Sequence, residues 1–449
     1  MFDLVLRNGT IVTPSWRKKA DVGVFEGKIS IIGNLNEISN FNVKKIIDIS
    51  GLFILPGIID SHVHFRDPGF TEREDFITGS TAAAFGGVTT VLDMPNTTPR
   101  IFSSQNYKLK EAAIKNRSYV DYAFWGYVLP GYFEEIENLA EAGIVGFKVM
   151  MCESASKTPI LNDGELLEAM WIVSKTGLPL AVHAENDQMM KHMRDKLIKA
   201  GRTDPEAHLE SRPIICEKEA VQRAILYAEE TLCKLYIAHT SSAEAVNLVR
   251  KAKFRGVQVF CETGPQYLLL EEEDMSRAGY ILKTNPPVRC SKINSDKMWE
   301  GIVDGTIEII GTDHAPHLLE NKMRRNVWEV PSGFPGVETS VPLMLTQVND
   351  GKITLEKFVE ITSQNPARIF GLYPRKGCIS PGSDADFTVV DLDAEGFIKA
   401  SELHSKNKYT PFDGSQVKAR IIYTIVRGNI VVEKGKLIGE PQGILCKRV

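Results

Sequence analysis

The hydrophobic positions of this 449-residue chain follow one pattern near both ends and a different pattern between them. Short runs of alternating apolar and polar residues, separated by turn residues, occupy residues 4–12, 21–32 and 45–49. Similar runs occupy residues 385–392 and 419–432. Period-two alternation bounded by turns predicts β-strands. The two β-rich ends therefore either pair into one small β-sandwich or form one sandwich each.

Eight apolar runs lie between these ends, and helical patterns separate most of them. Asp163 is expected to cap a helix with one apolar face that ends at Gly177, and a capping-box pattern that begins at Ser241 opens another helix that stops at Gly256. Eight strand–helix units predict a (β/α)8 TIM barrel. An open doubly wound sheet is the alternative, but no GxGxxG motif follows an early strand. The expected strands cover residues 52–59, 88–94, 119–128, 144–150, 178–183, 234–239, 257–262 and 307–312.

The predicted barrel and β-rich ends divide the chain into three parts. Residues 1–52 and 375–449 supply the sandwich, and residues 53–374 form the barrel. The carboxyl ends of barrel strands face one common mouth, so functional side chains are expected there.

Residues that bind metals gather at these strand ends. His62 and His64 lie two apart on extended backbone, so their side chains point to the same side. The chain has nine histidines, and four of them fall at expected strand ends. Each could alone be a core histidine, and Asp313 could alone cap a helix, but the joint placement of all five at strand ends is poorly explained by chance. The pattern favours zinc or a similar divalent ion. The candidate ligands are His62, His64, Lys148, His183, His239 and Asp313.

Lys148 is unusual in this set because an ammonium group repels metal cations and is costly to bury. It could extend its charge to solvent, pair with an anionic substrate, or carry carbon dioxide as a carbamate that bridges two metals. The residues alone leave these three possibilities open.

Composition narrows the class of function. Hydrophobic residues make up 43% and charged residues 24% of the chain, as in ordinary globular proteins. A net charge of −4 gives no case for nucleic acid or an anionic membrane as partner. The chain has no long apolar run, and its N-terminal residues do not read as a signal peptide. Seven scattered cysteines predict reduced thiols and a cytoplasmic location.

Three motifs are distinctive when they occur together, namely His62-Val-His64, Gly146-Phe-Lys148 and Thr312-Asp313-His314. With them the chain resembles the cyclic amidohydrolases, a group that comprises dihydroorotases, hydantoinases (dihydropyrimidinases) and allantoinases. The resemblance implies two divalent ions, with His62, His64 and Asp313 on one ion, His183 and His239 on the other, and carboxylated Lys148 (N6-carboxylysine) as the bridge. It also implies a homo-oligomer, either a dimer or a tetramer. The motifs that carry it are Pro56-Gly-Ile-Ile-Asp-Ser-His62-Val-His64, Gly146-Phe-Lys148, His183-Ala-Glu185-Asn186, His239-Thr-Ser, Glu262-Thr-Gly-Pro-Gln, Asn285-Pro-Pro-Val-Arg289 and Thr312-Asp313-His314-Ala-Pro-His317.

The implied reaction is the reversible opening of a small cyclic amide. Metal binding lowers the pKa of water toward neutrality and so generates the nucleophile. Asp313 would move the proton from that nucleophile to the departing ring nitrogen. A non-catalytic scaffold on the same barrel is disfavoured, because it needs neither Lys148 nor Asp313.

Substrate motifs are mixed. The sequences His64-Phe-Arg66-Asp-Pro-Gly69 and Met94-Pro-Asn96 resemble dihydroorotases, in which residues matching Arg66, Asn96 and His317 bind the substrate carboxylate. Asn285 is expected beside them. The first expectation is therefore a dihydroorotase-like enzyme that interconverts dihydroorotate and N-carbamoyl-aspartate. The motifs Met150-Met-Cys-Glu-Ser and Tyr409-Thr-Pro-Phe-Asp-Gly look more like hydantoinases and allantoinases, which is the alternative. Arg66 could also simply pair with Asp67, Glu72 or Glu74.

Overall fold

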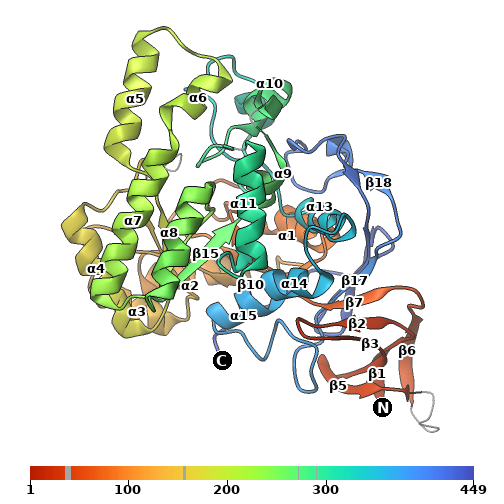
Figure 1. The fold of residues 1–449 in the computed structure, drawn as a ribbon. Coiled ribbons are helices and arrows are strands. Elements are labelled where there is room, and N and C mark those ends of the chain that lie inside the picture. The colour runs from red at the N-terminus through yellow and green to blue at the C-terminus, as the bar shows by residue number, and fades with distance from the viewer. Residues whose placement is uncertain (36–41, 155–157, 272, 290) are drawn as a thin grey trace.

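The structure is a computed structural model that describes residues 1–35, 42–154, 158–271, 273–289 and 291–449 (Figure 1). A barrel of parallel strands forms the centre, which confirms the predicted (β/α)8 class. Its strands run in the order β10-β9-β8 and β11-β12-β13-β14-β15-β16. They are β8 (Ile58–Val63), β9 (Val88–Asp93), β10 (Asp121–Phe124), β11 (Gly126–Tyr127), β12 (Phe147–Met150), β13 (Leu180–His183), β14 (Leu235–Ile237), β15 (Val259–Thr263) and β16 (Ile309–Ile310).

The barrel closes where the segment after β16 meets β8. Val63 pairs in parallel with His314, and the backbone N–H of His64 donates to the His314 carbonyl at 2.8 Å. The buried carboxylate of Asp60 accepts hydrogen bonds from Thr312 through both the backbone N–H and Oγ1. These bonds place the metal-ligand candidates of the first and last strands side by side.

Helices surround the barrel and also project from its mouth (Figure 1). Two helix starts lie one residue from their predicted positions, because Asn162, not Asp163, caps α4 and Ser242, not Ser241, caps α8. The outer helices are α1 (Phe76–Phe85), α2 (Ser104–Ile114), α3 (Glu135–Ala142), α4 (Asp163–Thr176), α7 (Ile214–Thr231), α8 (Ala243–Phe254), α11 (Lys292–Val303), α13 (Ser340–Asn349), α14 (Leu355–Val359), a π-helical turn (Glu360–Gln364) and α15 (Asn365–Ile369). The remaining helices lie in connecting segments. They are α5 (Asp187–Lys199), α6 (Pro205–Ser211), α9 (Pro265–Leu269), α10 (Glu273–Ala278), η2 (Gly279–Leu282), α12 (Leu319–Lys322) and η4 (Ala400–Glu402).

Both chain ends build one β-sandwich, which decides between the two alternatives left by the sequence. In Figure 1 the red N-terminal strands lie against blue C-terminal strands. Apolar residues from both ends, including Leu4, Val22, Phe387 and Ile425, share one buried cluster. One sheet has the order β5 (Lys28–Gly33), β4 (Asp21–Phe25), β1 (Phe2–Arg7), β6 (Val43–Asp48). The other has the order β22 (Lys436–Leu437), β21 (Asn429–Glu433), β20 (Arg420–Val426), β17 (Phe387–Asp391), β7 (Phe53–Pro56), β2 (Thr10–Val12), β3 (Arg17–Lys19), and β18 (Gly396–Phe397) pairs separately with β19 (Gln416–Val417).

The prediction of one barrel strand over residues 52–59 was wrong in one respect. Residues 53–56 pair with β17 in the sandwich, and the barrel strand begins only at Ile58. The chain crosses at Gly57, where an added Cβ would lie 2.3 Å from Thr89 Oγ1 and 2.6 Å from Asp386 Cβ. An apolar run gives no sign of such a crossing, because both halves are buried. The division predicted between residues 374 and 375 stays a prediction.

The described cysteines form no disulfide, and Cys290 lies outside the described residues. No described helix is both long and apolar enough to cross a membrane.

A buried lysine connects the sandwich to the barrel. Lys376 Nζ donates to Asp386 Oδ2 at 2.6 Å and to Asp121 Oδ2 at 2.7 Å, and it lies 3.3 Å from Asp384 Oδ2. Asp121 begins strand β10 of the barrel, and the other two aspartates immediately precede β17. The ammonium group thus neutralises a cluster of carboxylates that would otherwise repel one another.

We therefore expect Lys376→Met to destabilise the protein by about 3–5 kcal/mol, because it leaves buried carboxylates without their cation. The free energy of unfolding in urea measures the effect. Lys399→Met is the control, since Lys399 pairs with Glu402 on the surface and should change stability by about 0–1 kcal/mol. Equal stabilities of the two variants would contradict a central role for this cluster.

Candidate metal centre

The six predicted metal ligands converge on one cavity at the mouth of the barrel. Strands β8, β12 and β13 carry or immediately precede four of them, whereas His239 and Asp313 follow β14 and β16. His239 and Asp313 have positive φ values of 38° and 49°. Non-glycine residues rarely adopt this backbone conformation, and it is often found at functional sites. The six candidates are His62, His64, Lys148, His183, His239 and Asp313.

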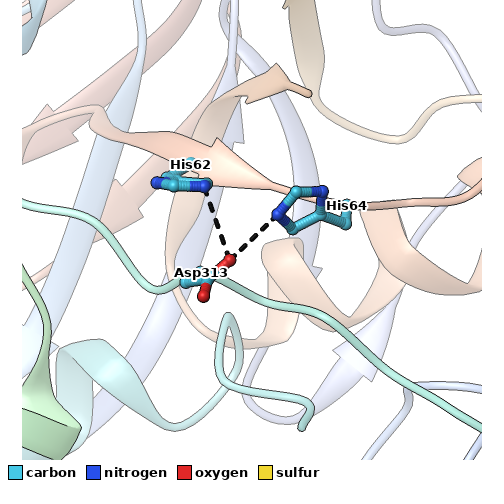
Figure 2. Close-up of side chains that lie close together, drawn as sticks. All are labelled: His62, His64 and Asp313. Atoms are coloured by element: carbon cyan, nitrogen blue, oxygen red, sulfur yellow. Dashed lines mark hydrogen bonds and ion pairs between the residues drawn. The ribbon is translucent and has the colours of Figure 1, made fainter. Parts of the chain in front are cut away.

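His62, His64 and Asp313 form the tighter group (Figure 2). Asp313 Oδ1 lies 2.9 Å from His64 Nε2 and 3.4 Å from His62 Nε2. The other ring nitrogens are occupied, since His62 Nδ1 donates to Glu262 Oε1 at 2.7 Å and His64 Nδ1 donates to Asn96 Oδ1 at 2.8 Å. This arrangement leaves both Nε2 atoms facing the carboxylate.

The charges in this group suit a cation. Burial lowers the pKa of His64 to about 4, so its imidazole is neutral near neutral pH. Burial opposes ionisation of Asp313, but the electrostatic effect of the nearby His62 ring and the hydrogen bond with His64 outweigh it and lower the pKa of Asp313 to about 2. Two imidazoles and an ionised carboxylate around one point are a divalent-metal donor set.

His183 and His239 form a second group. His183 Nε2 donates to Glu185 Oε2 at 2.8 Å, which leaves Nδ1 directed at His239 Nε2, 3.0 Å away. His239 Nδ1 has no hydrogen-bond partner among the described residues. Burial lowers the pKa of both rings. Two neutral imidazoles whose nitrogens share one small space fit a second metal ion.

Lys148 lines the same cavity, and burial lowers the pKa of its amine to about 8. Its Nζ is buried, and within the described part of the chain it has no hydrogen-bond partner. An uncompensated buried amine among metal ligands is unfavourable as an ammonium group. The residues present therefore fit two cations better if Lys148 carries a negative rather than a positive charge.

Side chains behind the ligands fix their orientation, and sequence reasoning gave them no role. The Glu262 carboxylate accepts hydrogen bonds from His62 Nδ1, from the His239 backbone N–H at 2.9 Å, and from Tyr236 OH at 2.7 Å. Glu185 holds His183 and is itself paired with Arg212. One signal was available for each carboxylate, because Glu262 ends an apolar strand pattern and Glu185 follows a predicted ligand by two residues.

The predicted substrate-binding residues are only partly together. Arg66, Asn96 and Asn285 line the cavity, but His317 does not. His317 is buried behind the wall, where its Nε2 donates to the Ser332 carbonyl at 3.0 Å. Asn96 holds the ring of His64, which is a role that the sequence did not predict. The cavity wall also includes Met94, Tyr127, Met150, Ser154, Thr284, Ala315 and Ser332.

Arg66 is buried with a positive φ of 63°, and its Nε has no partner among the described residues. Among the described residues, no ion pair joins Arg66 to the neighbouring acids that the sequence offered as partners. Asp67 pairs with Arg117, Glu72 pairs with Arg73, and the Glu74 carboxylate accepts from the Lys406 backbone N–H. The guanidinium is therefore available to a group inside the cavity.

Comparisons with known proteins agree with this geometry. The sequence profile of the Amidohydrolase family matches residues 53–431. An L-hydantoinase of Paenarthrobacter aurescens is 38% identical over 98% of this chain and 96% of its own length. An allantoinase of Desulfitobacterium hafniense is 40% identical, with 98% of each chain covered. The solved structure of L-hydantoinase (dihydropyrimidinase) from Arthrobacter aurescens is similar with a TM-score of 0.95, at 38% identity over 98% of each chain.

We expect Glu262→Gln to weaken metal binding by about 10–100-fold, the usual effect of removing a partner behind a metal ligand. Competition with a chromophoric chelator measures the affinity. Glu308→Gln is the matched control, because Glu308 is a carboxylate just before β16 that accepts from the Cys261 N–H and pairs with Lys253, away from the ligands. Native-like affinity in Glu262→Gln would show that the His62 ring is oriented without it.

Proposed function

Because this chain belongs to the amidohydrolase family and is a metal-dependent cyclic amidohydrolase, we propose that it opens neutral rings of the hydantoin or allantoin type. The observation that carries this proposal is the convergence of five histidine and aspartate ligands and an unpartnered Lys148 on one cavity. Relatives of nearly equal length supply the substrate class, since they are named hydantoinases and allantoinases.

The first sequence-based expectation, a dihydroorotase-like substrate, is not supported by these relatives. That expectation depended on Arg66, Asn96 and His317 binding one carboxylate together. His317 donates to a main-chain carbonyl and Asn96 is hydrogen-bonded to a metal-ligand ring. Arg66 remains free to donate to a carbonyl oxygen of a neutral ring or of its exocyclic substituent.

We propose that the Lys148 amine combines with carbon dioxide, releasing a proton, to give a carbamate that would hold both cations. The amine is buried, and its position beside both groups of ligands supports this assignment. The carbamate would convert the only basic member of the set into a carboxylate-like donor, which removes the charge conflict.

The remaining chemistry belongs to the side chains. When bound, the divalent ions supply Lewis-acid activation of water and of the scissile carbonyl. Asp313 Oδ2, the carboxylate oxygen that does not face the two imidazoles, accepts the proton of the attacking water. Asp313 then returns that proton to the ring nitrogen as the carbon–nitrogen bond breaks, so the open product leaves with a neutral amide or amine.

The native protein should open allantoin, a 5-substituted hydantoin or dihydrouracil faster than dihydroorotate. Neutral rings need no counter-charge in the cavity, whereas a carboxylate would depend on Arg66, the one described lining cation once Lys148 carries the proposed carbamate. Ultraviolet loss of the ring chromophore measures turnover, and protein treated with a chelator is the control. Efficient turnover of dihydroorotate alone would contradict the proposed substrate class and leave the metal site unaffected.

Asp313→Asn should lower kcat by about two to four orders of magnitude, because the amide cannot carry the proton. Rates are expressed per bound metal ion, since Asp313 is also a proposed ligand. Asp304→Asn, which removes a surface partner of Arg250, is the control and should leave kcat unchanged. If Asp313→Asn kept kcat within a few-fold of the native value, another group would have to transfer the proton.

A further inference from the structure

Two lysines beside the cavity are buried without any carboxylate among their hydrogen-bond partners. Lys322, the last residue of α12, has a fully buried side chain, and Lys283 is 8% exposed. Burying an ammonium group is costly unless it is fully hydrogen-bonded. Two buried lysine side chains at neighbouring positions therefore need hydrogen-bond acceptors close to both amines.

Those partners are main-chain carbonyls of two loops. Lys322 Nζ donates to the carbonyls of Lys283 at 3.1 Å, Pro331 at 3.1 Å and Gly333 at 3.0 Å. Lys283 Nζ donates to the carbonyls of Val327 at 2.6 Å and Val330 at 2.5 Å. The three N–H groups of an ammonium match the three carbonyls around Lys322, which a planar guanidinium would not do.

The same two loops form part of the substrate cavity. Thr284 and Asn285 directly follow Lys283, and Ser332 lies between two carbonyls that Lys322 binds. The Asn285 amide lies 3.1 Å from Ser332 Oγ, so the loops also meet at the cavity surface. The backbone N–H of Gly333 donates to the Lys283 carbonyl at 2.9 Å. The lysines thus hold the loops together directly behind the residues that face the cavity.

We propose that Lys322 and Lys283 are positioning residues that hold Thr284, Asn285 and Ser332 at the cavity wall so that the ring binds there. The inference rests on the proposed function, because it assigns this wall to the binding of the cyclic amide. The lysines act through five carbonyls and touch neither metal ligands nor substrate. Without the two lysine amines, the carbonyls of Val327, Val330, Pro331 and Gly333 lose these donors, and the contact between the two loops weakens to the bonds that Gly333 and Ser332 make.

Lys322→Met tests the proposal, because methionine has a similar length but no donor. We expect KM for the ring substrate to rise about tenfold or more, the effect of losing about 1.4 kcal/mol or more of binding, while kcat and metal content change little. Amide hydrogen exchange should accelerate in residues 327–334 but not across the barrel strands. Lys283→Met should shift the same measurements in the same direction.

Lys234→Met is the matched control. Lys234 also donates to a main-chain carbonyl, that of Gly177 at 3.0 Å, but it lies at the opposite end of the strands, just before β14. It should leave KM and the exchange of residues 327–334 unchanged. In Lys322→Ala, added ethylammonium should partly restore both the KM and the slow exchange, because it returns an ammonium group to the three carbonyls.

The exchange readout needs no substrate, so it separates this inference from the proposed function. Native protein that leaves neutral rings intact, with accelerated exchange confined to residues 327–334 in Lys322→Met, would refute only the proposed substrate class. Unchanged exchange and unchanged KM in Lys322→Met would overturn the positioning role. Loss of metal and kcat together with KM, with faster exchange throughout the barrel, would also overturn it, since the lysine would then be a general structural residue.

Discussion

The buried carboxylate of Glu262 connects the two groups of metal ligands inside the barrel. One oxygen accepts from both the His62 ring and the His239 backbone, and the other accepts from the hydroxyls of Tyr236 and Ser61. Burial alone would raise its pKa, but the electrostatic effect of the neighbouring His62 ring and these hydrogen bonds outweigh burial and keep its pKa low. Gly311 leaves the space that this carboxylate needs, because an added Cβ would lie 2.4 Å from Glu262 Oε2. One buried anion thereby sets the ring orientation of one group and the backbone position of the other.

The cavity combines a rigid side with a side that is built from loops. The metal-ligand side follows from parallel strands whose ends share one mouth, and hydrogen bonds that Thr312 donates to the Asp60 carboxylate close it. The other side of the cavity consists of loops that carry Arg66, Asn285 and Ser332. In the proposed function, these loops recognise the particular ring. Loops can change between relatives without disturbing the barrel, which explains how hydantoinases and allantoinases share one fold with this chain. Lys283 and Lys322 hold these loops in place through hydrogen bonds to main-chain carbonyls, whereas strand pairing holds the metal-ligand side.

The barrel and the six ligand candidates were predictable from sequence because both depend on local patterns. Apolar strands ending in His183 or His239 need no knowledge of distant contacts, only the rule that barrel strand ends converge. The crossing at Gly57 was not predictable, since strands β7 and β8 are both apolar and only their partners differ. The direction of His317 and the partner of Asn96 also depend on contacts between distant segments. Substrate preference could therefore not be predicted from local patterns, because it depends on which polar side chains remain free in the cavity.

Lys148 is the residue that we propose completes a site for two cations. Elemental analysis of the native protein and of Lys148→Ala, each equilibrated with zinc and carbonate and then freed of loose metal, tests it most directly. The native protein should hold about two divalent ions per chain, as two-metal hydrolytic sites do, and Lys148→Ala should hold fewer than one. Full occupancy in Lys148→Ala, with native affinity, would contradict the bridging role and show that the histidines and Asp313 suffice.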